Sequence, residues 1–127
     1  MEKPNLATMP AEEYELLLCD LFGNMGLEMG QAAEGPRWLA TDPRPLFGGP
    51  VVIYAVRGKA VSAPTAAGLA EEVAAAGATK GILVAIDGFE VEAYEAVAGR
   101  PIELLDGPAL LNLLAEHSRV KARIEPA

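Results

Sequence analysis

The stretch Lys80–Leu114, KGILVAIDGFEVEAYEAVAGRPIELLDGPALLNLL, determines most of the predicted fold. Its first part, residues 81–86, is continuously apolar, which is typical of a β-strand covered on both faces. A short helix is expected over residues 91–97, and a second apolar strand over residues 102–105. Asp106 follows as the N-cap of a leucine-rich helix. Strands that alternate with helices in this way predict parallel strands joined by right-handed crossovers.

The sequence before this stretch predicts a helix, an antiparallel hairpin, a central strand and a second helix. Apolar residues recur every three or four positions between residues 10 and 25, which indicates an amphipathic helix. Two short strands are expected over residues 27–33 and 37–41, and the β-branched run at 51–56 predicts a central strand. A helix over residues 62–77 leads to the next strand. The predicted fold class is therefore α/β, with a central mixed sheet of about five strands flanked by helices.

The length of the chain predicts one domain. With 127 residues, the chain can bury one hydrophobic core but not a second. We expect an N-terminal extension over residues 1–9, a single domain over residues 10–117 and a basic C-terminal tail over residues 118–127.

The composition excludes several classes of protein. No apolar run approaches the roughly 20 residues that a membrane-spanning helix needs. The first four residues lack the basic and then apolar pattern of a signal peptide. We therefore expect no membrane partner and a cytoplasmic location. The single cysteine excludes an internal disulfide and a cysteine-rich metal site.

The charge of the chain is unevenly distributed. Its formal net charge of −8 repels nucleic acid unless basic residues gather in one place. Between residues 30 and 61, four basic residues stand against two acidic residues. The candidate DNA contacts are these four basic residues, Arg37, Arg44, Arg57 and Lys59.

Seven short segments carry a resemblance to a known family. They are PAEEYE at 10–15, MGLE at 25–28, VIYAVR at 52–57, VS at 61–62, GILV at 81–84, GF at 88–89 and IELLDG at 102–107. In this order they resemble the Mrr-type domain of the restriction endonuclease-like, or PD-(D/E)xK, superfamily over about residues 10–116. The resemblance implies a three-layer restriction endonuclease-like fold and a family whose active members cleave DNA with a divalent metal.

The chemistry of that family requires three particular side chains on two strands. An acidic residue on the second strand holds the metal, and a Gln or Glu on the third strand precedes by two positions a Lys that helps to deprotonate the attacking water. The flanking motifs place these positions near Trp38 and on Tyr54 and Val56. None of these side chains can perform the required role. We therefore predict three degenerate catalytic positions, no metal cofactor, and a Trp38 indole that packs over the former catalytic cleft.

Relocated catalytic residues are the alternative. Asp42 lies four positions beyond Trp38, Lys59 lies three beyond Val56, and Glu15 matches an acidic position on the first helix of the family. Under this alternative the chain is an active Mg²⁺-dependent DNA endonuclease.

The leading hypothesis is a catalytically degenerate Mrr-like domain that acts through binding. The family suggests DNA as a partner, but the acidic net charge predicts only weak DNA binding. A protein partner or a homodimer is therefore an equally open prediction.

Overall fold

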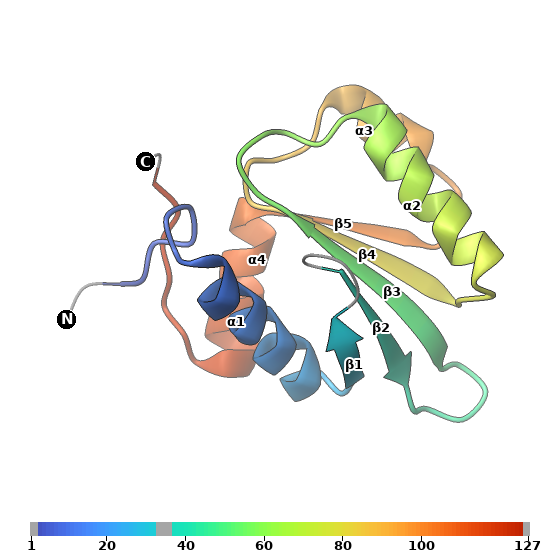
Figure 1. Cartoon of the computed structure of the whole chain (residues 1–127), viewed down its shortest axis with the longest axis horizontal. Coiled ribbons are helices and arrows are strands. Elements are labelled where there is room, and N and C mark those ends of the chain that lie inside the picture. Colours follow the sequence, from blue (N-terminus) through green and yellow to red (C-terminus); the bar gives the residue numbers. More distant parts are fainter. Residues whose placement is uncertain (1–2, 33–36, 126–127) are drawn as a thin grey trace.

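A five-stranded mixed sheet forms the centre of the molecule in the computed structural model, which describes residues 3–32 and 37–125 (Figure 1). The strands lie side by side in chain order: β1 (Glu28–Ala32), β2 (Arg37–Asp42), β3 (Gly49–Val56), β4 (Lys80–Ala85) and β5 (Ile102–Asp106). The pairs β1–β2 and β2–β3 are antiparallel, whereas β3–β4 and β4–β5 are parallel. The hairpin and the parallel crossovers predicted from the sequence are thus confirmed.

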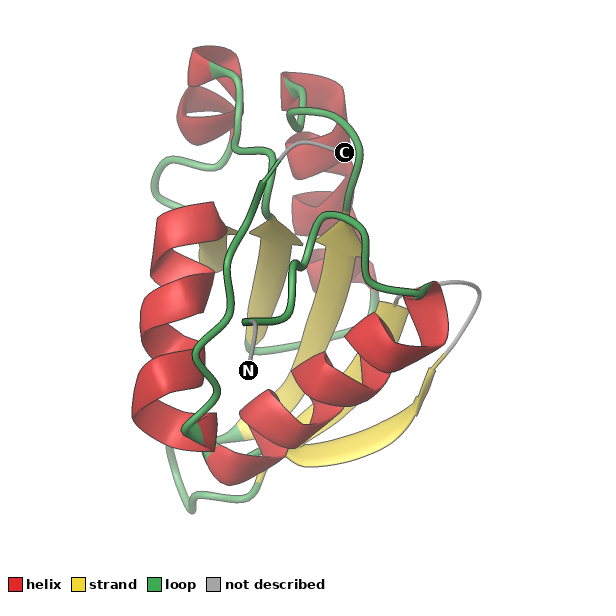
Figure 2. Cartoon of the chain, turned by 90° about the vertical axis from the view of Figure 1, so that its left-hand side faces the viewer, coloured by secondary structure: helices red, strands yellow, loops and turns green. Residues whose placement is uncertain are grey.

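Helices cover both faces of this sheet (Figures 1 and 2). One face carries α1 (Ala11–Asn24), α4 (Gly107–Leu113) and the π-helical turn η1 (Leu114–Ser118). The other face carries α2 (Ala63–Ala75) and α3 (Val91–Ala96). The three-layer α/β architecture predicted from the sequence is confirmed.

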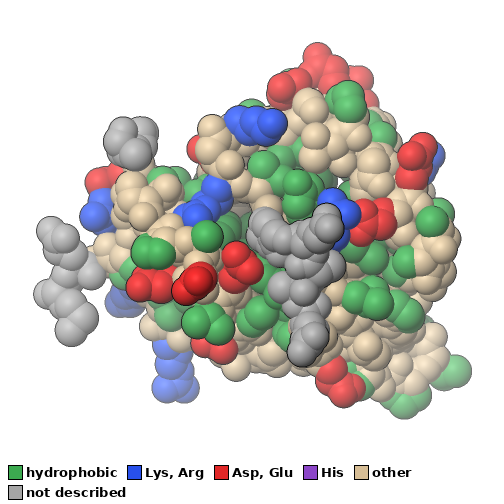
Figure 3. Space-filling model, viewed as in Figure 1, with side chains coloured by type: hydrophobic (Ala, Val, Ile, Leu, Met, Phe, Trp, Pro, Cys, Tyr) green, Lys and Arg blue, Asp and Glu red, His purple; other side chains and the backbone are tan. Residues whose placement is uncertain are grey.

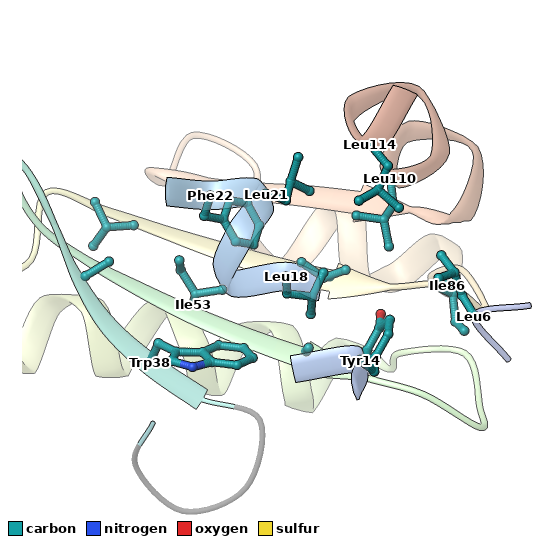
Figure 4. Packing of buried hydrophobic residues seen from close by; sticks show 14 residues of the cluster. Leu6, Tyr14, Leu18, Leu21, Phe22, Trp38, Ile53, Ile86, Leu110 and Leu114 are labelled. Carbon is teal, nitrogen blue, oxygen red and sulfur yellow. The ribbon is translucent and has the colours of Figure 1, made fainter. Parts of the chain in front are cut away.

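Two apolar clusters fill the spaces between the layers. The cluster under α1 and α4 includes Trp38 and Ile53, which are 2% and 0% exposed (Figure 4). The cluster under α2 and α3 includes Val52 and Leu83. Because successive strand residues point to opposite faces, β3 contributes its odd-numbered residues to the first cluster and its even-numbered residues to the second. This alternation decides which side chains can meet at a site.

Helix ends follow the local sequence signals. The Asp106 side chain accepts a hydrogen bond of 3.0 Å from the backbone N–H of Ala109 and caps α4, as predicted. After α1, Gly26 has a φ of +106°, a conformation that glycine adopts without steric cost. The backbone N–H of Leu27 then donates to the carbonyl of Phe22, which satisfies one of the last carbonyls of the helix.

The two terminal segments pack against the domain and against each other. Leu6 is 0% exposed and belongs to the cluster under α1. Its backbone N–H donates to the carbonyl of Arg123 over 2.9 Å, and Ile124 also packs on that cluster. Leu6 and Ile124 therefore belong to the packed cluster, although they lie in the segments that the sequence analysis named an N-terminal extension and a C-terminal tail. The segments are too short for their apolar pattern to be recognised, and the pairing joins residues at opposite ends of the chain.

Among the described residues, no helix combines the length and the apolar character needed to cross a membrane.

Candidate functional site

The register of the hairpin separates the three positions at which the family pattern expects catalytic residues. Trp38 on β2 pairs with Ile53 on β3, and Arg37 pairs with Tyr54. Directly paired residues of antiparallel strands share one face of the sheet. Trp38 therefore points under α1, whereas Tyr54 and Val56 belong to the cluster under α2. The prediction that Trp38 packs in the core is confirmed, but it does not fill a cleft shared with Tyr54 and Val56, because it lies on the opposite face.

The residue that does lie beside Tyr54 is a cation. The Arg37 guanidinium carbon lies 4.6 Å from the centre of the Tyr54 ring, and Nη1 donates to Oε1 of Glu72 on α2 over 2.8 Å. The Arg37 and Glu72 side chains are 39% and 34% exposed, so this ion pair contributes under about 1 kcal/mol to stability. The sequence analysis placed the strand-two position near Trp38 and did not identify Arg37 as the neighbour of Tyr54. The register between β2 and β3 decides which of these two residues faces Tyr54.

The other two positions offer no chemistry for a metal. Tyr54 and Val56 are half-buried and pack against the apolar cluster under α2. Valine has no oxygen or nitrogen in its side chain, and a phenol is a poor ligand for a hard divalent cation. No group of three or more His, Cys, Asp or Glu side chains suited to a metal ion occurs in the part of the chain that the structure describes.

Asp42, one of the relocated candidates, is occupied by an ion pair at the far end of the hairpin. Both of its carboxylate oxygens accept hydrogen bonds from the Arg44 side chain, at 3.0 Å and 2.7 Å. These bonds hold the pKa of Asp42 below its usual value. Asp42 pairs with Gly49, where β3 begins, so the length of β3, about 23 Å at the usual rise per residue, separates it from Val56.

Glu15 and Lys59 lie toward the opposite end of β3. Glu15 on α1 lines a cavity of about 260 Å³ together with Tyr14, Ala55 and Arg57. Lys59 is exposed in the connection between β3 and α2. The structure therefore does not bring Asp42, Glu15 and Lys59 together around one point.

Arg57 has a structural role in this region. Its Nη1 donates to the carbonyl oxygens of Leu6 and Met9 over 2.9 Å and 2.6 Å. Its guanidinium carbon lies 4.4 Å from the centre of the Tyr14 ring. These contacts fasten the N-terminal segment to the end of β3, so much of the hydrogen-bonding capacity of Arg57 is already used.

The four candidate DNA contacts do not form one surface. Arg37 lies on the α2 face and Arg57 on the α1 face, while Arg44 lies at the far end of the hairpin. Arg37 and Arg44 are each paired with a carboxylate. On the face seen in Figure 3, Lys and Arg side chains are scattered, and Asp and Glu side chains lie among them.

Tyr14 is a buried residue of α1 with a polar group. It is 2% exposed, and its hydroxyl has no hydrogen-bond partner among the described residues. Burial raises the pKa of Tyr14 to about 12, although the Arg57 guanidinium acts in the opposite direction. The hydroxyl is therefore neutral at physiological pH.

Comparisons with known proteins agree with the fold. A solved structure of the DNA modification-dependent restriction endonuclease AspBHI superposes with a TM-score of 0.64 and 17% sequence identity. The match covers 87% of this chain and 32% of that one, so the chain spans about a third of the length of that protein. No curated protein matches the sequence. The family model Mrr_cat, described as a restriction endonuclease, matches residues 6–114, which is most of the chain. The chain therefore belongs to the Mrr_cat family of restriction endonuclease domains.

Proposed function

We propose that this chain is a restriction endonuclease-like domain that no longer hydrolyses DNA and that acts by binding a protein partner. One observation carries the proposal: Arg37 lies beside Tyr54 and Val56 on the α2 face of the sheet, and the family resemblance assigns the Gln/Glu and Lys positions to Tyr54 and Val56. A cation, a phenol and an alkyl group stand where the chemistry needs carboxylate or amide oxygens and an ammonium group.

The electrostatics around Tyr54 support the loss of metal binding. A divalent cation placed beside Tyr54 would meet the Arg37 guanidinium, which lies 4.6 Å from the ring centre. Glu72 is the nearby carboxylate, and it already accepts a hydrogen bond from Arg37. Binding a metal there would require breaking that ion pair and leaving the guanidinium next to a second cation, which is unfavourable.

The arrangement of the basic residues favours a protein partner over DNA. Tight contact with DNA requires several lysines and arginines that are free to replace the counterions of successive phosphates. Here Arg37 and Arg44 are paired with carboxylates, Arg57 is bonded to backbone carbonyls, and the net charge of the chain is −8. Protein contact has support in β1, which is an edge strand of the sheet within the described residues, and in Leu39 on β2, which is 55% exposed.

Cleavage of supercoiled plasmid in the presence of Mg²⁺ or Mn²⁺ tests the loss of hydrolysis. The wild-type protein and the Asp42→Ala variant should leave the plasmid equally intact, and neither metal should raise the melting temperature of the wild-type protein. Metal-dependent nicking that disappears in Asp42→Ala would instead establish the alternative of an active endonuclease with relocated ligands.

Two binding measurements distinguish the candidate partners, a second copy of the chain and DNA. Sedimentation over a range of concentrations should reveal self-association if the partner is a second copy of the chain. A mobility shift with duplex DNA at low salt should be absent or unaffected by Lys59→Ala, an exposed lysine whose loss would weaken phosphate contact. A salt-sensitive shift that Lys59→Ala weakens would favour DNA and contradict the proposed protein partner.

A further inference from the structure

A cavity of about 560 Å³ opens at the end of the sheet where β3 and β4 begin. Its walls come from the end of α1, the turn that follows it, the connection between β2 and β3, and the starts of β3 and β4. This is the end of the sheet away from Val56, and the family resemblance assigns none of its three catalytic positions to it. Its volume lies within the range of roughly 300–1,000 Å³ that is usual for small-molecule sites.

The floor and the rim of this cavity are apolar. Phe22 and Val51 form part of the floor and are only 1% and 3% exposed, so they belong to the core as well as to the cavity. Met25 and Phe47 stand at the opening and are 40% and 77% exposed. An apolar group that entered the cavity would remove exposed surface of Met25 and Phe47 from water, which favours binding, and would make van der Waals contacts with Phe22 and Val51.

The charged side chains that line the cavity carry a net positive charge. The charge of Asp42 is balanced by the Arg44 guanidinium, which donates hydrogen bonds to both carboxylate oxygens. Lys80 begins β4 on the same face as Ile82 and belongs to none of the ion pairs among the described residues, although its charge contributes to the lowered pKa of Asp42. One uncompensated ammonium group therefore lines an apolar cavity in a chain whose net charge is −8.

We infer that this cavity binds a small anionic molecule with an apolar body, such as a medium-chain carboxylate. The apolar body lies against Phe22 and Val51, and the anionic group pairs with the Lys80 ammonium. A small molecule fits better than a protein surface, because reaching the buried floor requires a group that enters the cavity. The inference does not depend on the side chains at Tyr54 and Val56, since the cavity lies at the other end of β3.

Calorimetric titration with decanoate, below the concentration at which it forms micelles, tests the inference. Wild-type protein should bind decanoate saturably with a 1:1 stoichiometry, and Lys80→Gln should weaken the affinity by about threefold to tenfold, the effect of one partly exposed charge-assisted contact. The matched control Lys59→Gln removes an exposed lysine outside the cavity and should leave the affinity unchanged. Decylammonium, which carries the opposite charge on the same chain length, should bind more weakly than decanoate.

Nuclear magnetic resonance locates the site independently of the variants. Decanoate should shift the amide signals of residues that line the cavity, among them Leu27, Phe47 and Lys80, and leave those near Val56 unchanged. The absence of saturable decanoate binding would overturn the inference. So would equal affinities of wild-type protein, Lys80→Gln and decylammonium, or shifts centred elsewhere in the molecule.

Discussion

The two ends of β3 differ in how much open space remains beside their side chains. At the end that carries Tyr54 and Val56, apolar packing and the Arg37 and Arg57 contacts leave a smaller cavity of about 260 Å³ beside Ala55. At the end that begins with Gly49, a cavity of about 560 Å³ remains open and is lined by both core and exposed residues. The comparison teaches that one strand can be closely packed near one end and border an open, partly apolar cavity at the other.

Two aromatic-to-alanine changes, at Trp38 and at Phe47, should differ most in their effect on the free energy of unfolding. Trp38→Ala removes a side chain that is 2% exposed, and we expect it to lower the free energy of unfolding by about 3–5 kcal/mol. Phe47→Ala removes a side chain that is 77% exposed and should change it by less than about 0.5 kcal/mol. Urea denaturation followed by circular dichroism measures both values. Similar losses of unfolding free energy in Trp38→Ala and Phe47→Ala would contradict the contrast between closely packed and exposed surroundings of the two side chains.

Arg57→Ala tests whether Arg57 is structural. The change deletes hydrogen bonds to Leu6 and Met9 and the contact with the Tyr14 ring, so we expect a loss of about 2 kcal/mol in the free energy of unfolding. Arg100→Ala, which removes an exposed arginine outside any described ion pair, is the matched control and should be nearly neutral. If Arg57→Ala were equally neutral, Arg57 would be free for another role.

Restoring the family pattern on β3 should not restore cleavage. The double variant Tyr54→Gln, Val56→Lys places a half-buried charge against the apolar cluster under α2, and we expect it to lower the free energy of unfolding by about 1–2 kcal/mol. It should remain inactive on plasmid with Mn²⁺, because Arg37 still occupies the position beside Tyr54. Cleavage by this variant would show that Arg37 does not prevent metal binding.

A small effect at neutral pH is expected for Tyr14→Phe. The Tyr14 hydroxyl is buried without a hydrogen-bond partner among the described residues, so its removal should change the free energy of unfolding by less than about 1 kcal/mol.

The pH dependence of Tyr14→Phe gives a second readout. The pKa of Tyr14 is raised from 10.0 to about 12, so the stability contributed by its neutral form is complete below pH 10 and is lost as the pH rises toward about 12. Denaturation curves across this interval should therefore depend less on pH in Tyr14→Phe than in wild-type protein. An unchanged dependence would contradict the shift.

The fold could be predicted from the sequence because each element carries a local signal. Continuous apolar runs indicated β3 and β4, and the Asp106 cap indicated the start of α4. The Mrr-type resemblance supplied the arrangement of these elements, and the family match over residues 6–114 confirms it. Local signals suffice to predict a strand or a helix whose structure is determined by residues adjacent in the sequence.

The candidate site was harder to predict because it depends on the register between strands. A shift of one residue moves a side chain to the opposite face of a sheet, and this is why Trp38 was assigned to the same cleft as Tyr54. The pairing of Leu6 with Arg123 and the cavity beside Lys80 also join segments that are distant in sequence. No short-range pattern marks such contacts.

Paramagnetic broadening by Mn²⁺ tests the central claim most directly, because it reports metal binding whether or not cleavage follows. Titration of ¹⁵N-labelled protein with Mn²⁺ should produce no saturable loss of amide signals centred on Arg37, Tyr54 and Val56. Saturable broadening centred on these three residues would show that a metal site persists between β2 and β3, and would contradict the account.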